Sequence, residues 1–539
     1  MIILVSIVLF AFVLRVWGIN FGLPYEYHVD EVQYVRQAAS MGENGLEPAV
    51  WNNPPLFKYI LLAEYGAAYV IGRVLNIYSS TAMFGSIHSA DPSLLYLLGR
   101  GTSALFGALT VLLLGAAGKQ FFNNRVGLLA AWFLATSFSH VRDSHFAVND
   151  IFVTFLSTLV LFFSLKIYEQ GKLKWYVLGG VALGLGFAAK YTAVFSAISI
   201  ILAHFLSRDI HIRPVSELRL SRLVISFVST VGAALVASPY FLLTPAKVLN
   251  DIYTHLFLAG KLGFDGWQID PSGGYLFYLK SLAWGLGYGI LLLSLLGLVV
   301  GILQRSRRAL IILSLPVLLY ILMGRQQMYF ARFMMPAIPP MLLWSANMLD
   351  EAVKYWIVVN KRNVSLAFVT LVVTLQPLVS SIRLDALLEK EDTRTLAKTW
   401  IESNIPDGSK IALDRPFHGP PLSSYEHSVP NSTHSYNVLI VGGVGLHTKP
   451  VDWYKKNGFE YLISSSFIYD IPLIWKEDQA LKNNFYSSLE EEYTLIQVIG
   501  PSSSPSVLPF IFDEIYAPAI SLWDRQHPGP VLRIYKLSN

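Results

Sequence analysis

The chain has 539 residues, of which 53% are hydrophobic and 14% are charged, and its mean hydropathy is +0.47. This composition excludes an ordinary soluble protein and indicates a polytopic membrane protein. The absence of cysteine excludes disulfides, thiolate metal sites and a cysteine nucleophile. The net charge of +5 is concentrated in short loops, so it indicates membrane topology and not nucleic-acid binding.

The first 382 residues contain a succession of apolar segments. Segments of about 17 to 25 residues can cross a bilayer, and about 11 transmembrane helices are predicted on this criterion. They lie near residues 2–20, 94–117, 126–142, 150–167, 175–189, 191–207, 223–243, 281–303, 309–323, 333–349 and 363–382. Residues 31–42 and 56–72 are predicted to be helices lying in the extracytoplasmic interface, because a crossing at 56–72 would put Asp30 and Asp150 on opposite faces.

The loops between these segments alternate in charge. Positive residues gather on one side, in loops that contain Lys119 and Arg125; Lys166, Lys172 and Lys174; Arg208, Arg213, Arg219 and Arg222; Arg305, Arg307 and Arg308; and Lys354, Lys361 and Arg362. The positive-inside rule assigns that side to the cytoplasm. The loop after the first helix, the turn at 140–150 and residues 383–539 are then extracytoplasmic.

The sequence changes character after Ile382 to a mixture of charged and apolar residues, LDALLEKEDTRTLAKTWIESNIPDGSKIALD. A helix near 385–404, a strand at KIALD and short apolar stretches at NVLIVGG and EYLISSS predict a small α/β domain. The chain is therefore predicted to consist of a membrane part, 1–382, and a soluble extracytoplasmic domain, 383–539. That domain would either select acceptors or act as a lid.

The turn at 140–150, HVRDSHFAVND, is the first candidate for a functional site. It places Arg142, Asp143, His145 and Asp150 between two strongly apolar runs. Ionisable groups at a membrane boundary are costly and often functional, but a plain polar cap on a membrane hairpin is the structural alternative.

Further ionisable residues map to the same face. They are Asp30 and Glu31 in YHVDE, Lys58 in NNPPLFK, Lys190 in GLGFAAKYTAVF, and Arg325 and Arg332 in GRQQMYFARFMMPAIPP. Lysine and arginine suit the phosphate of a lipid head group, and a carboxylate can take the proton of an incoming hydroxyl. Two structural alternatives remain. Lysine and arginine near helix ends snorkel to the interface, and Asp30 or Glu31 would suit a helix N-terminus.

The order of these motifs resembles that of a known superfamily. HVDEVQYVRQAASMGENG, WNNPPLFKYI, RDSHFAVND and GGVALGLGFAAKYTAVF follow one another over roughly residues 1–200, and ARFMMPAIPPM comes later. This pattern is similar to that of the GT-C glycosyltransferases, in the branch of the protein O-mannosyltransferases and the lipid A aminoarabinose transferases. The resemblance implies an α-helical polytopic membrane protein of GT-C fold, with interfacial helices and a C-terminal extracytoplasmic α/β domain.

The resemblance also implies an inverting transfer, on the outer face of the cell membrane, of a hexosyl or pentosyl group from a polyprenyl-phosphate sugar. It implies Asp30 as the catalytic base, Asp150 as support for the site, and Lys58, Lys190 and Arg332 as ligands of the donor phosphate. The remaining candidates are Glu31 for catalysis and Arg142 and His145 for substrate binding. Asp143 and His145 add charge that the family's motif does not require.

Several alternatives stay open. His28 beside Asp30 and Glu31 could bind a divalent metal, but the available cations make a metal unnecessary, and none is predicted. A transporter or flippase of a lipid-linked or anionic substrate is the main alternative to an enzyme, although no second copy of the motifs exists. Within the superfamily, an oligosaccharide or polymer transferase is the runner-up. The acceptor is a lipid, a glycan or a protein, and membrane lipids surround the chain.

Overall fold

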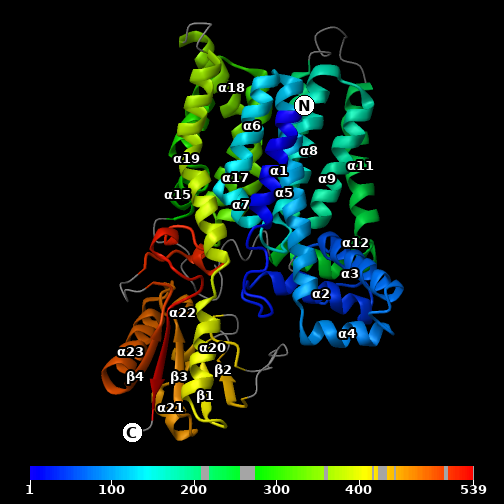
Figure 1. The fold of residues 1–539 in the computed structure, drawn as a ribbon. Coiled ribbons are helices and arrows are strands. Elements are labelled where there is room, and N and C mark those ends of the chain that lie inside the picture. The colour runs from blue at the N-terminus through cyan, green and yellow to red at the C-terminus, as the bar shows by residue number, and fades with distance from the viewer. Residues whose placement is uncertain are drawn as a thin grey trace.

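A computed structural model describes residues 1–51, 53–207, 218–254, 273–356, 362–414, 418–422, 434–441, 445–502 and 508–537. Long helices stand side by side in one half of the molecule, and a sheet with its own helices forms the other half (Figure 1). Between the two lie short helices and loops, and this boundary layer contains the ionisable residues identified in the sequence.

Within the described ranges, five helical segments are long and apolar enough to cross a membrane. They are α5 (Ser93–Phe121), α8 (Asp150–Gln170), Leu220–Ala237 of α11 (Leu218–Ala237), α17 (Arg307–Gly324) and Asn363–Asn404, which includes α19 (Arg362–Leu388). Shorter apolar helices are α1 (Ile2–Val16), α9 (Leu173–Ala189), Tyr191–Leu206 and α16 (Tyr288–Leu303). The helical membrane architecture is confirmed, and the number of crossings stays a prediction.

Several predicted spans are broken helices. Residues 126–142 divide at Ser137 into α6 (Asn124–Thr136) and α7 (Phe138–Asp143). Residues 281–303 divide at Gly287, which separates α15 (Gly274–Leu286) from α16. The backbone of Gly287 has φ +83°, and a Cβ there would lie 2.7 Å from Pro377. A glycine is therefore needed at this break.

The loop after α1, which is predicted to be extracytoplasmic, forms three helices, α2 (Glu31–Asn44), α3 (Leu56–Val74) and α4 (Thr81–Ala90). They lie crosswise at the end of the long helices (Figure 1), an arrangement that suits the predicted interfacial position of 31–42 and 56–72. On α3, Phe57, Leu61 and Tyr65 recur at helical spacing, and all three are buried. Their shared face fixes the height at which the residues just before α2 meet the membrane helices.

Small residues allow the membrane helices to approach closely. On α5, a Cβ added to Gly118 would lie 2.7 Å from the Cα of Gly127 on α6. Close approach through glycine is typical of helix packing in membranes, where dispersion contacts replace the hydrophobic effect. The close α5–α6 pair leads directly into α7 and the charged turn.

The C-terminal half contains a five-stranded mixed sheet in the order β2-β1-β3-β5-β4. The strands are β1 (Lys410–Leu413), β2 (Asn437–Ile440), β3 (Tyr461–Ser465), β4 (Thr494–Ile499) and β5 (Leu532–Lys536). β1 pairs in parallel with β2 and β3, and β5 is antiparallel to β3 and β4. β1 corresponds to the strand predicted at KIALD. Helices α20 (Thr393–Asn404), α21 (Val451–Lys456), α22 (Ser466–Tyr469) and α23 (Lys476–Glu492) accompany the sheet.

The membrane part and the C-terminal part share more contacts than a single linker between them would provide. Helix α19 continues to Leu388, so the predicted boundary at 382/383 falls inside a helix. Between β4 and β5 the chain returns to the membrane half through the short helix η7 (Phe512–Ile515). Phe512 and Ile515 belong to the same buried cluster as the membrane helices, and the ring of Phe512 lies 5.5 Å from that of Phe330. The division into 1–382 and 383–539 stays a prediction.

Candidate active site

The charged turn is buried. Every residue from Phe133 to Asp150 is buried, including the four ionisable residues of the turn. A polar cap on a membrane hairpin would face water, so this burial argues against that alternative. The turn instead forms an inner wall at the boundary between the two halves of the chain.

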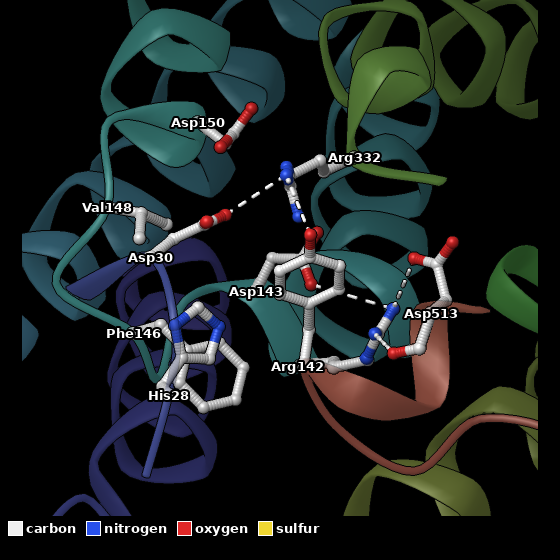
Figure 2. Close-up of a pocket in the computed structure, with 10 residues that line it drawn as sticks. His28, Asp30, Arg142, Asp143, Phe146, Val148, Asp150, Arg332 and Asp513 are labelled. Atoms are coloured by element: carbon white, nitrogen blue, oxygen red, sulfur yellow. Dashed lines mark hydrogen bonds and ion pairs between the residues drawn. The ribbon is translucent and has the colours of Figure 1, made fainter. Parts of the chain in front are cut away.

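Asp30 and Arg332 face each other across this boundary. The Nη2 of Arg332 lies 3.0 Å from the Oδ2 of Asp30 (Figure 2). Although Asp30 immediately precedes α2, its side chain makes no capping hydrogen bond to that helix. Arg332 lies in the short helix η4 (Ala331–Ala337), and its guanidinium stacks 4.1 Å from the ring centre of Tyr516. Asp30 is therefore oriented towards a cation, and not towards its own helix.

These residues line one pocket, whose empty volume is about 280 Å³ when space open to solvent is included. Its lining residues are His28, Asp30, Arg142, Asp143, Phe146, Val148, Asp150, Arg332, Asp513 and Tyr516. They come from the loop before α2, the turn between α7 and α8, η4 and the C-terminal segment η7 (Figure 2). The pocket thus combines carboxylates and guanidinium groups beside an apolar surface.

Asp150 pairs with Lys190 at one end of the site. The Nζ of Lys190 donates a hydrogen bond of 2.6 Å to the Oδ1 of Asp150 and lies 5.2 Å from the ring centre of Phe333. Asp150 is the first residue of α8, where the partial positive charge of the helix N-terminus favours a carboxylate. Lys190 itself follows α9 and keeps a cation next to the pocket.

Arg142 lies between two carboxylates. Its Nη2 donates to the backbone oxygen of Asp513 at 2.9 Å, and its Nη1 lies 3.6 Å from the Oδ1 of Asp513 and 3.8 Å from the Oδ1 of Asp143. Burial raises the pKa of Asp143 to about 6, and Arg142 opposes part of this shift. Burial likewise raises the pKa of Asp513. A segment of the C-terminal half thus holds the arginine of the turn in place.

The predicted catalytic role of Glu31 is not supported by its position. Its side chain is fully buried and accepts two hydrogen bonds of 2.8 Å from Arg100 on α5. It also accepts a hydrogen bond of 2.7 Å from the backbone N–H of Ala147. Because all these partners are protein groups, Glu31 anchors the turn in this structure, and Asp30, the predicted base, is the acid of the two that lines the pocket. A catalytic role of Glu31 stays a prediction.

Two predicted substrate ligands also lie outside the pocket. Lys58 donates to Gln37 at 2.8 Å and to the backbone oxygen of Val50 at 3.1 Å. The ring of His145 bonds to the backbone oxygens of Val141 at 2.9 Å and Trp17 at 3.0 Å. Neither side chain lines the pocket, so the structure does not bring them to the other candidates. Asp30, Asp150, Arg142 and Arg332 line it together, and Lys190 contacts it through Asp150.

Sequence reasoning missed part of the lining. Asp513 and Tyr516 lie far along the chain in a segment without a recognisable motif, so nothing in the sequence pointed to them. His28 is part of YHVDE, and the sequence indicates only a metal ligand there. Its ring stacks on Phe146 at 4.2 Å, and burial lowers its pKa well below the usual value. Among the described residues, no group of three or more histidine, aspartate or glutamate side chains is arranged to hold a metal ion.

Comparisons with known proteins agree with this architecture. Residues 98–241 match the family model described as dolichyl-phosphate-mannose-protein mannosyltransferase. The chain is similar to the oligosaccharyltransferase of Archaeoglobus fulgidus, with a TM-score of 0.56, 13% identity, and coverage of 96% of this chain and 77% of that one. It is similar to ArnT from Cupriavidus metallidurans, with a TM-score of 0.51, 15% identity, and coverage of 91% and 96%. No sequence among the curated proteins matches the chain.

The resemblance predicted from the sequence motifs is thereby confirmed at two levels. The match over residues 98–241 includes the turn that carries Arg142 and Asp150, and the structural similarity extends over nearly the whole chain. The chain therefore shares its fold with the archaeal oligosaccharyltransferase and with ArnT, and its residues 98–241 match a model of mannosyltransferases.

Proposed function

We propose that the chain transfers a sugar from a polyprenyl-phosphate donor to an acceptor hydroxyl on the extracytoplasmic face of the membrane, with inversion at the anomeric carbon. The observation that carries this proposal is the Asp30–Arg332 pair in a pocket that also contains Asp150 and Arg142. A carboxylate beside a guanidinium supplies a proton acceptor and an anion ligand in one place.

The proposed reaction is a single displacement. The acceptor oxygen forms a bond to the anomeric carbon while the bond from that carbon to the phosphate oxygen breaks. The polyprenyl phosphate leaves with the bonding electron pair, and the acceptor proton passes to Asp30. Arg332 and Lys190 neutralise the charge that develops on the phosphate, and Asp150 orients Lys190.

Two further observations support a polyprenyl-phosphate sugar as the donor. The archaeal oligosaccharyltransferase of similar fold has been solved in complex with a dolichol-phosphate and an inhibitory peptide, with a TM-score of 0.54 to this chain. Lipid-linked phosphate also suits the position of the pocket, where the long apolar helices end and the polar half begins. The extracytoplasmic orientation rests on the positive loops at the opposite end of these helices.

The proposal contains no step through a metal ion. Asp30 is committed to Arg332 in this structure, and Glu31 is committed to Arg100. The carboxylates that a metal would need are therefore held by cations.

An oligosaccharide donor is the second candidate, because the fold is shared with an oligosaccharyltransferase. The two candidates share Asp30 and differ in the size of the transferred glycan. Mass spectrometry of the transferred group separates them.

The test uses whole cells and purified protein. Glycolipids and glycoproteins of cells that express the wild-type chain are compared by mass spectrometry with those of cells that express Asp30→Asn or lack the chain. We expect a glycan that depends on the chain and on Asp30. In proteoliposomes, the same glycan should be released from its polyprenyl phosphate with free polyprenyl phosphate as the second product. A lipid that changes leaflet without losing its sugar would instead establish a flippase.

A further inference from the structure

Two neighbouring residues of the pocket have polar atoms without partners. The Oδ2 of Asp143 and the Nε of Arg142 are both buried, and neither has a hydrogen-bond partner within the described part of the chain. Both residues line the pocket, and their exposed fractions are only 7% and 1%. Buried polar atoms are nearly always satisfied, so a matched pair of this kind at a pocket wall indicates a ligand.

The two terminal nitrogens of Arg142 already have an anionic neighbour. Its two terminal nitrogens face Asp513, which approaches from η7, while the nearest oxygen of Asp143 is 3.8 Å away. If Asp143 served only to neutralise Arg142, a direct hydrogen bond between the two would be expected. The carboxylate of the C-terminal segment supplies that neutralisation instead and leaves Asp143 with one oxygen to spare.

The chemistry of the two atoms selects among ligands. The Nε–H of Arg142 is a donor, and the Oδ2 of ionised Asp143 is an acceptor. A hydroxyl group accepts one hydrogen bond and donates another, so a single hydroxyl satisfies both atoms. A protonated amine only donates, and it would leave Arg142 unsatisfied while lying next to its positive charge.

We propose that Asp143 and Arg142 together bind one hydroxyl group of the transferred sugar, which makes the chain selective for a neutral sugar over one that carries a protonated amine at that position. This inference rests on the proposed function, and it deepens it by naming the class of sugar. Asp143 is then a specificity-determining residue that the family's motif does not require.

The donor sugar fits this role better than the acceptor. Asp30, the proposed base, must contact the acceptor hydroxyl, and Arg332 lies 3.0 Å from it. In the view of Figure 2, Asp30 and Arg332 lie between Asp150 and the Arg142–Asp143 pair. A sugar whose phosphate is held by Arg332 and Lys190 can then present a hydroxyl to Arg142 and Asp143, which line the same pocket.

The test measures the ratio of kcat/KM for a donor that carries the hydroxyl to kcat/KM for the analogue that lacks it. The wild-type chain in proteoliposomes is first given polyprenyl-phosphate mannose, glucose, galactose and 4-amino-4-deoxyarabinose. The best neutral donor is then compared with its single-deoxy analogues. We expect wild-type kcat/KM to fall at least about a hundredfold for one deoxy position, since a site that binds a hydroxyl rejects an analogue without it. In Asp143→Ala the difference at that position should shrink to about threefold, because the acceptor that distinguishes the two donors is gone; Asp143→Asn keeps an acceptor oxygen and should retain more of the difference.

The ratio is independent of how much of each variant folds, because both donors are measured on one preparation. Asp150→Asn is the matched control, since it removes a pocket carboxylate that does not face the proposed hydroxyl; it should lower transfer from both donors by the same factor. Equal discrimination in wild type and Asp143→Ala would overturn the inference and leave the proposed function intact. So would a loss of discrimination confined to acceptors, or 4-amino-4-deoxyarabinose as the best donor. Absence of transfer from every donor would remove the proposed function and the inference with it.

Discussion

Asp30 and Arg332 form an ion pair of 3.0 Å inside the pocket, between residues that are far apart in the chain. The pair keeps both side chains oriented before a substrate arrives. In the proposed reaction, a donor phosphate that binds Arg332 gives the guanidinium a second anion and frees the carboxylate to accept a proton. Under this proposal, one contact serves both anion binding and activation of the base.

Replacement of Asp30 by asparagine should abolish most transfer without unfolding the chain. A general base contributes about a hundredfold to ten-thousandfold to the rate, and asparagine keeps the shape but cannot accept the proton. The rate is measured as release of polyprenyl phosphate, with membrane insertion checked by size-exclusion chromatography. Because asparagine is as good an N-cap as aspartate, an unchanged rate would show that Asp30 acts only at the start of α2.

Glu31 should behave in the opposite way. Removing one partner of a buried ion pair costs about 3–5 kcal/mol, because the remaining charge has no compensation. Glu31→Gln should therefore lower the thermal unfolding temperature markedly, since Arg100 would keep its charge. Asp30→Asn, one residue away, is the control; its side chain is 25% exposed and that of Arg332 17%, so water screens the remaining charge and the temperature should fall less than in Glu31→Gln. Normal stability of Glu31→Gln together with lost transfer would return Glu31 to the catalytic group.

Tyr516 should act on Arg332 mainly through its ring. The guanidinium lies 4.1 Å from the ring centre, whereas the contact with the hydroxyl is a long 3.4 Å. Tyr516→Phe should keep transfer within about threefold of wild type, and Tyr516→Ala should raise the KM for the donor about tenfold, which corresponds to a cation–π contact of 1–2 kcal/mol. Equal losses in the two variants would assign the effect to the hydroxyl.

The pH dependence of stability should report on Asp143. Its pKa is raised from 3.8 to about 6 in the folded chain, so the folded state holds a proton that the unfolded state has lost between these values. The stability associated with Asp143 is therefore complete below about pH 4 and is lost as the pH rises through 6, by on the order of 3 kcal/mol. Unfolding temperatures measured from pH 4 to 7 should fall less steeply in Asp143→Asn than in wild type. Parallel profiles would contradict the assignment.

The natural absence of cysteine allows a clean test of topology. Asn124 at the start of α6 and Asn484 on α23 are both exposed and uncharged, which makes Asn124→Cys and Asn484→Cys a matched pair. A membrane-impermeant maleimide added to intact cells should label the second variant alone, and permeabilisation should expose the first. Labelling of both in intact cells would overturn the orientation.

The sequence predicted the residues of the site best where they belong to local motifs. Asp30, Arg142, Asp150 and Arg332 each stand in a short pattern at the end of an apolar segment, and the pocket unites them. Glu31 shows the limit of such patterns. Adjacent positions at the start of a helix point about 100° apart, so which acid faces the pocket depends on how α2 packs.

The C-terminal contribution could not have been predicted from the sequence. Asp513 and Tyr516 reach the pocket because Phe512 and Ile515 pack among the membrane helices and because Glu514 accepts backbone hydrogen bonds from Ala519, Ile520 and Ser521. These are contacts between distant parts of the chain, and they leave no periodic signal. The strand at KIALD was predictable because it is local. The return of the chain between β4 and β5 was not predictable, because it depends on contacts between distant parts of the chain.

That return has a consequence for biosynthesis. The pocket lacks Asp513 and Tyr516 until η7 is in place, and η7 follows all the membrane helices in the chain. A ribosome inserts the membrane helices first, so Arg332 and Arg142 enter the bilayer boundary without Tyr516 and Asp513. We therefore expect the lining of the pocket to stay incomplete during synthesis until η7 has reached the same face.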